Sequence, residues 1–145
     1  AVSTDRPDGF HTLDLLLAEG RKLNLVATDD AHFSDPDYFG GWVMVKSNKN
    51  SPVSILESLK EGAFYSSQGP DLVDIEIETG SVEVHSTPVS TVIIQGQGSA
   101  YVAQHGEALV STQLSLDRLK KSPWLRVTVI DHNGKRAWSN PIWRN

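Results

Sequence analysis

The sequence contains no cysteine among its 145 residues, which excludes disulfides, thiolate metal sites and a cysteine nucleophile. It also has no run of about 18 apolar residues, the length that a membrane-spanning helix needs, and no apolar segment with a basic lead-in that would mark an export signal. We therefore expect a soluble protein without a membrane partner. The compartment stays open, although the cytoplasm is favoured.

Positive charge is also scarce. The formal net charge is −5, and the only basic cluster is Arg118-Leu119-Lys120-Lys121, which is typical of a solvated surface. We therefore predict no nucleic-acid partner. The sequence lacks the Gly-x-Ser-x-Gly elbow, a phosphate-binding loop and Gly-x-Gly-x-x-Gly. Apolar residues make up 39% of the chain and charged residues 21%, which predicts an ordered globular core.

The most informative stretch is an apolar run, residues 23–28, that stops at Asp29, Asp30 and His32. A short apolar run that ends in polar residues predicts a buried strand whose carboxyl end carries the chemistry. Asp30 and His32 are two residues apart, so on a strand both side chains point to one face. A carboxylate oxygen beside an imidazole nitrogen provides half of a divalent metal site. The alternative is an ordinary Asp-rich turn, because Asp tolerates turn geometry.

Four stretches of the chain resemble parts of one known family. They are Thr28-Asp29-Asp30-Ala31-His32, residues 41–46, residues 62–70 and residues 134–142. Together they are similar to the end of a polymerase and histidinol phosphatase (PHP) domain with its appended small β-domain. The resemblance implies a distorted (β/α) barrel and the activity of a metal-dependent phosphoesterase.

The same resemblance implies roles for individual residues. Asp30 and His32 match the last metal motif of the family, an Asp-x-His, and would bind divalent Zn, Mn or Fe. Asp29 would orient one of these ligands by hydrogen bonding. In the intact protein, clustered divalent ions would activate water to attack a small phosphoester substrate.

Most of the family's other metal ligands have no counterpart in this sequence. A complete member opens with a His-x-His strand, whereas the remaining histidines here, His11, His85, His105 and His132, each stand alone. The chain also begins with Ala1 rather than Met. We therefore expect the C-terminal portion of a larger enzyme, inactive as this chain. Its expected partner is the missing N-terminal barrel portion or a second copy.

The residue pattern changes near Gly69-Pro70. Before this point, helical spacing predicts helices over residues 12–19 and 52–61, with Thr12 and Ser51 as N-caps, and alternation predicts a strand over residues 42–46. After it, alternation and turn signals predict short antiparallel strands over residues 72–77, 82–85, 91–95, 99–104, 109–116, 125–131 and 136–139. We therefore predict an α+β fold: an incomplete PHP-type α/β barrel segment (residues 1–69) followed by an antiparallel β-sandwich (residues 70–145).

The alternative function is a non-catalytic β-sandwich that binds a protein partner or a carbohydrate. Trp124, Trp138 and Trp143 bear on this choice, because tryptophans either pack in a core or form an exposed platform for sugars; packing is favoured. Tyr38 and Phe39 follow the metal motif in a loop. They either line a pocket or pin the loop to the barrel, and pinning is favoured.

Overall fold

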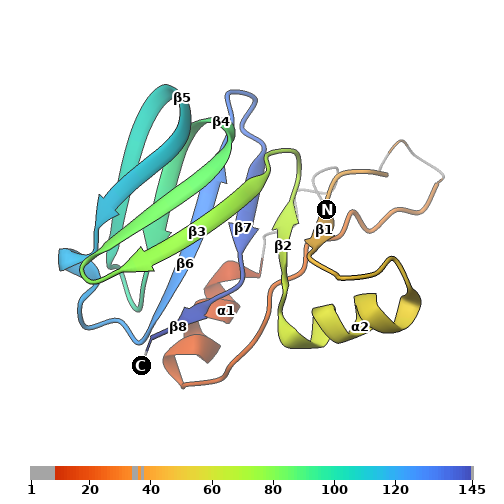
Figure 1. The fold of residues 1–145 in the computed structure, drawn as a ribbon, viewed down its shortest axis with the longest axis horizontal. Coiled ribbons are helices and arrows are strands. Elements are labelled where there is room, and N and C mark those ends of the chain that lie inside the picture. Colours follow the sequence, from red (N-terminus) through yellow and green to blue (C-terminus); the bar gives the residue numbers. More distant parts are fainter. Residues whose placement is uncertain (1–8, 34–35, 37, 145) are drawn as a thin grey trace.

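One eight-stranded antiparallel sheet forms most of the structure, a computed structural model that describes residues 9–33, 36 and 38–144 (Figure 1). The strands are β1 (Trp42–Val45), β2 (Phe64–Ser67), β3 (Leu72–Glu78), β4 (Ser81–Gln95), β5 (Tyr101–Ser115), β6 (Trp124–Ile130), β7 (Arg136–Ser139) and β8 (Ile142–Trp143). Their order in the sheet is β1-β2-β7-β6-β4-β3, with β5 paired to β4 and β8 paired to β6. The helices of the described chain are α1 (Phe10–Ala18), α2 (Pro52–Glu61) and a short 3-10 helix, Asp117–Leu119.

The long hairpin of β4 and β5 makes the sheet curl. Along β4, even-numbered residues such as Val82 and Val84 point inward, then Val89 does so, and then Val92 and Ile94. Each change of phase requires an extra residue, and the pairing with β5 shifts between His85 and Val89 and again between Val89 and Thr91. Because of these bulges, β3 pairs with the first part of β4 and β6 with the last part, and the sheet closes partly on itself (Figure 1).

The core lies inside this curled sheet. It is built from aliphatic side chains of β3, β4, β6, β7 and the segment that follows β5; its buried members are Leu72, Val82, Val84, Val89, Val92, Ile94, Leu116, Leu119, Leu125, Val127, Val129 and Ala137. Trp124 and Trp138 are buried as well, and the Lys22 ammonium lies 5.7 Å from the ring centre of the half-buried Trp143. The prediction that the tryptophans pack is confirmed for Trp124 and Trp138.

Local signals placed both ends of α2 correctly but not the start of α1. Ser51 caps α2, since its hydroxyl accepts the Ser54 N–H at 3.3 Å, Pro52 opens the helix, and Gly62 ends it in the left-handed conformation at φ 75°. The predicted cap of α1, Thr12, is wrong: the helix begins at Phe10, and Gly9 makes no side-chain cap. Within the described residues, neither helix has the length and apolarity needed to cross a membrane.

The predicted α+β fold class, with an incomplete PHP-type barrel segment before a β-sandwich, is wrong, because the described chain is mostly antiparallel β-structure. A (β/α) barrel needs parallel neighbours, yet β1 pairs antiparallel with β2. Residues 23–28 are not a strand of the sheet. In place of two facing sheets there is one curled sheet. It contains strands from both sides of the predicted boundary at residues 69 and 70, because β2 pairs with β7.

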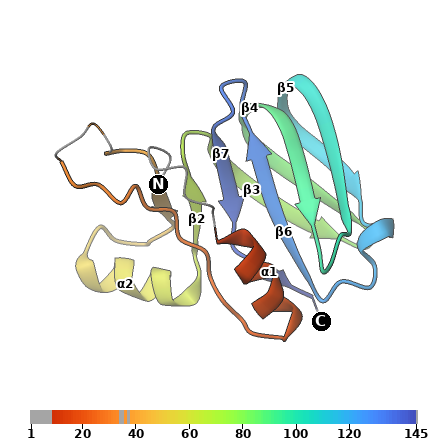
Figure 2. The same cartoon turned by 180° about the vertical axis from the view of Figure 1, so that it is seen from behind.

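Helix α1 lies against the back of the sheet (Figure 2), and an ion pair between a buried arginine and a half-buried aspartate attaches it there. Arg126 on β6 is only 2% exposed, and its Nη2 donates to both oxygens of Asp14 at 3.0 and 3.2 Å. The Phe10 ring lies 4.5 Å from the guanidinium carbon and 5.6 Å from the Trp138 ring. The helix therefore contributes the charge and the aromatic face that a buried guanidinium needs.

We predict that Asp14→Ala lowers the free energy of unfolding by about 2 kcal/mol, because it leaves the Arg126 guanidinium buried and unpaired. Urea unfolding followed by circular dichroism measures this change. In Asp14→Ala/Arg126→Met no buried charge remains, so the double variant should be more stable than Asp14→Ala alone. A double variant less stable than Asp14→Ala would contradict the role of the ion pair.

Candidate functional site

An extended segment, residues 21–32, carries the candidate metal ligands past the sheet without joining it. Odd-numbered side chains from Leu23 onward are half-buried, and even-numbered ones are exposed, so the segment has the alternation of a strand. The backbone of this segment makes hydrogen bonds to side chains of the sheet, where a strand would bond to the backbone of its neighbour. The Ser66 hydroxyl accepts the Ala27 N–H at 2.9 Å and donates to the Leu25 carbonyl at 2.8 Å, while Asn140 Oδ1 accepts the Leu25 N–H at 2.9 Å.

The four stretches that resemble a PHP domain meet around this segment. A Cβ on Gly41 would lie 3.2 Å from the Thr28 carbonyl oxygen, and a Cβ on Gly62 would lie 3.0 Å from the Asn24 amide. Asn140 donates to the carbonyls of Gly62 and Phe64 at 3.1 and 3.0 Å. Residues far apart in sequence therefore form one contact network, and the close approach at Gly41 and Gly62 leaves little room for a side chain.

Asp30 and His32 are both exposed. Asp30 has a φ of 55°, so the alternation of an extended chain does not continue through it, and the shared face of the two side chains stays a prediction. Asp29 is half-buried on the opposite face, and its Oδ2 accepts the Phe39 N–H at 2.7 Å, so it holds the loop that follows. Its role in orienting a metal ligand stays a prediction. In the part of the chain that the structure describes, no group of three or more His, Cys, Asp or Glu side chains converges on a metal position. One carboxylate and one imidazole suit Zn, Mn or Fe but need further donors.

The loop after Asp30 displays three aromatic rings. Phe33, Tyr38 and Phe39 are 81%, 51% and 80% exposed, so the prediction that Tyr38 and Phe39 pin the loop is wrong. The rings contact one another instead: Phe33 stacks on Tyr38 with centroids 6.3 Å apart, and Tyr38 meets Phe39 edge-on at 5.6 Å. These side chains are available to a ligand or a partner.

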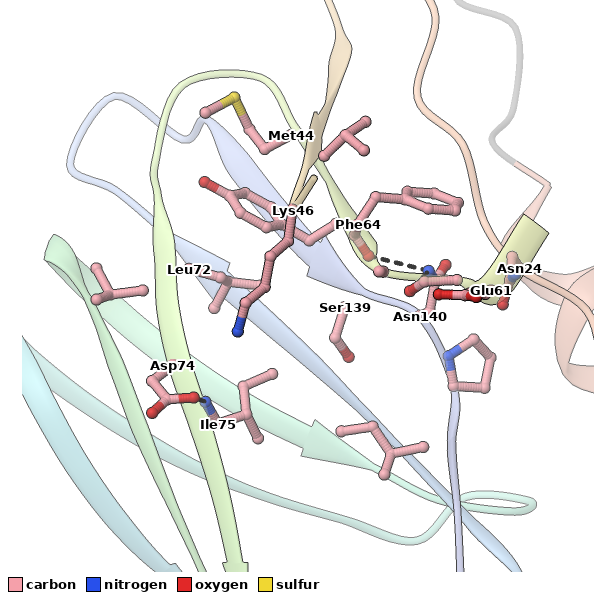
Figure 3. A pocket seen from close by; sticks show the side chains of 17 residues that line it. Asn24, Met44, Lys46, Glu61, Phe64, Leu72, Asp74, Ile75, Ser139 and Asn140 are labelled. Carbon is pink, nitrogen blue, oxygen red and sulfur yellow. Dashed lines mark hydrogen bonds between the residues drawn. The ribbon is translucent and has the colours of Figure 1, made fainter. Parts of the chain in front are cut away.

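A pocket of about 730 Å³ lies beside β1, β2 and β3, and Figure 3 shows the side chains that line it. Lys46, which directly follows β1, extends into it, and Asp74 lies on the β3 side, with Leu72 and Ile75 near both (Figure 3). Tyr65 also lines the pocket and donates its hydroxyl hydrogen to Asp71 Oδ1 at 3.0 Å. Burial, followed by this hydrogen bond and the Asp71 charge, raises the pKa of Tyr65 to about 12.

Sequence reasoning missed the residues that hold the segment and the pocket. Ser66 is fully buried inside β2, and a polar residue amid a buried strand is the signal that marks it. Asn140 directly follows β7, where an amide is well placed to bond free backbone groups. The pocket had no sequence signal, because Lys46 follows β1 and Asp74 lies in β3, and the packing of these strands depends on the curl of the sheet.

Tyr65→Phe should change how stability depends on pH. The pKa of Tyr65 is about 12 in the folded protein against 10.0 for an ordinary tyrosine, so between these values the native state keeps a proton that the unfolded state releases. The stabilisation from this hydroxyl is thus complete below pH 10 and is lost as the pH rises to 12. Urea unfolding should show a smaller loss of stability over this range in Tyr65→Phe than in the wild type.

The matched control is Tyr101→Phe, at an exposed tyrosine of β5, which should keep the wild-type dependence on pH. If the free energy of unfolding fell equally between pH 10 and pH 12 in the wild type and in Tyr65→Phe, this would contradict the role of the Tyr65 hydroxyl. Below pH 10 we expect Tyr65→Phe to lower the free energy of unfolding by about 1 kcal/mol, because one hydrogen bond is lost.

Comparison with known proteins identifies neither a family nor a function for the chain. No family model, no curated protein and no solved structure matches the chain. The likeness to a PHP domain therefore remains a resemblance of four stretches, and the function has to be inferred from the residues and their geometry.

Proposed function

We propose that the chain is a portion of a metal-dependent phosphoesterase of the PHP type and contributes two metal ligands, Asp30 and His32. One observation carries the proposal: both side chains are exposed at the end of an extended segment that the Ser66 and Asn140 side chains hold in place. A carboxylate and an imidazole are donors that Zn, Mn and Fe accept. The contact network among the four resembling stretches supports the same assignment.

The chain's own residues have separate tasks in this proposal. Asp30 would bind through a carboxylate oxygen and His32 through a neutral ring nitrogen, while Asp29 holds the following loop through the Phe39 N–H. When bound, divalent ions supply a water of lowered pKa and a positive charge that binds the phosphoryl oxygens of a small phosphoester. The remaining ligands come from outside the described residues. The proposed source is the missing N-terminal portion or a second copy.

A binding module is the second candidate function, and the pocket beside β1 and β3 favours it. Its volume of about 730 Å³ and its mainly apolar lining with Lys46 and Asp74 are typical of a small-molecule site. A sugar platform has less support, because Trp124 and Trp138 are buried. A small molecule that binds the pocket but does not depend on Asp30 or His32 would favour this function.

We expect the chain to bind Zn²⁺ or Mn²⁺ weakly, through Asp30 and His32. Asp30→Ala and His32→Ala should each weaken binding at least about tenfold, because even residues behind metal ligands are worth that much. Isothermal titration calorimetry of the whole chain measures this. His105→Ala is the control, since His105 is an exposed histidine of β5 that pairs with the Thr91 hydroxyl. Unchanged binding in both ligand variants would refute the metal site.

We also expect no hydrolysis of a generic aryl phosphate by this chain alone, because two protein ligands cannot hold a metal cluster. Supplying the N-terminal portion of the protein should restore activity, and Asp30→Ala should abolish it again. Metal-dependent hydrolysis by the 145-residue chain alone would contradict the proposal.

A further inference from the structure

The curled sheet does not close fully, and β3 forms one of its open borders (Figure 1). In the part of the chain that the structure describes, β3 pairs with β4 on one side and with no strand on the other. The hydrogen bond from the Tyr65 hydroxyl to Asp71 joins β2 to the residue just before β3. Beyond this connection most β3 side chains are exposed, Val73 at 70% and Ile77 at 40%. Another chain can therefore reach this edge.

The backbone of β3 has free hydrogen-bonding groups along its open edge. The Ile75 N–H donates to Asp74 Oδ1 at 2.9 Å, a side chain of its own strand, so the pairing with β4 does not use this N–H. In an antiparallel pair, alternate residues turn their N–H and C=O groups away from the partner strand, so Ile77 has the same orientation as Ile75. The edge thus offers backbone donors and acceptors at the spacing that a further strand needs.

The pocket of Figure 3 lies along the same edge. Leu72, Asp74 and Ile75 of β3 form one wall, and Met44 of β1 and Phe64 of β2 belong to the opposite wall (Figure 3). A strand that pairs with β3 would point its side chains alternately into this pocket and out to solvent, because successive residues of a strand face opposite sides. Since the lining is mainly apolar, the side chains that enter the pocket have to be apolar as well.

Negative charge on the outer face of β3 restricts the occupant further. Asp74, Glu76 and Glu78 are all exposed, and alternation places them together on one face. No lysine or arginine among the described residues forms an ion pair with them, although the His85 imidazole lies 4.0 Å from Glu76. A second copy paired through β3 would bring two such rows of carboxylates together, which is unfavourable. A strand with basic residues on this face would instead form opposite-charge pairs.

We propose that β3 and the pocket form a binding site for an extended peptide of a partner protein, which adds a strand to the sheet. The residues of this peptide alternate between apolar side chains, which enter the pocket beside Leu72 and Ile75, and lysine or arginine, which lie beside the carboxylates of β3. The inference rests on the second candidate function, the binding module, and does not depend on Asp30 or His32. The occupant is a strand because one wall of the pocket is an open strand edge.

The peptide Lys-Val-Lys-Val-Lys-Val-Lys tests the site when it is titrated into the whole chain and followed by NMR of the backbone amides. It should shift the amide signals of β3 and slow the hydrogen exchange of Ile75 and Ile77. The acidic counterpart, with glutamate in place of lysine, should bind at least about tenfold more weakly, because several opposite-charge pairs become like-charge pairs. Equal binding of the two peptides would overturn the proposal.

Methylation of the peptide backbone distinguishes strand addition from binding of side chains alone. One peptide carries a methyl group on the backbone nitrogen of every valine, and the other on that of every lysine. Only alternate N–H groups of a paired strand face its neighbour, so one modified peptide should lose at least about tenfold in affinity and the other should not. Loss in neither, or equal loss in both, would overturn strand addition. A small molecule that enters the pocket while no peptide binds would also overturn it, but would leave the binding module standing.

A pair of double variants tests the charges of β3. Glu76→Gln/Glu78→Gln should reduce the preference for the basic peptide several-fold. Glu57→Gln/Glu107→Gln makes the same change in net charge at exposed glutamates of α2 and β5, outside the pocket lining, and should keep the preference. An equal reduction in both variants would overturn the site, because the attraction would be that of the acidic chain as a whole. A dimer joined through β3 without peptide would overturn it too, because the occupant would be a second copy.

Discussion

The candidate site depends on how Asn140 uses its side-chain amide. Its oxygen accepts the Leu25 N–H, and its nitrogen donates to the carbonyls of Gly62 and Phe64, so one side chain joins three segments. Ser66 adds a second connection, because its hydroxyl bonds both Ala27 and Leu25. These hydrogen bonds hold the extended segment in place, as the backbone of a neighbouring strand would otherwise do. The positions of Asp30 and His32 therefore follow from polar side chains on the end of β7 and on β2.

The positions of many strands could be predicted from the local sequence pattern, but the pairing of the strands in the sheet could not. Alternation and turn signals located β3, β6 and β7 to within one residue at each end. They divided β4 and β5 into two strands each, because the bulges near Val89 change the phase of the alternation without ending the strand. Whether such pieces join into one curled sheet or separate into two sheets depends on contacts between residues far apart in sequence. Single-strand patterns carry no information about those contacts.

The barrel prediction failed for a related reason. Helix–strand alternation over the first half of the chain is typical of parallel α/β units, and the local elements α1, β1 and α2 do form. Direction is a property of the pair, however, and β2 lies antiparallel between β1 and β7. By contrast, Ser51, Pro52 and Gly62 were placed correctly, since capping is decided by the residues themselves.

For the site, the spacing of Asp30 and His32 predicts a shared face only if the chain is extended there, and the φ of 55° at Asp30 departs from that geometry. The exposed rings of Phe33, Tyr38 and Phe39 were unexpected, since large aromatics are usually buried. The positive φ values of Phe33 and Phe39 also have no sequence signal, as the left-handed region normally belongs to glycine. A chain that needed only a turn after residue 28 could have used glycine at these positions without strain. With phenylalanine at both positions, contacts outside the turn have to hold the backbone, among them the Asp29 carboxylate that accepts the Phe39 N–H.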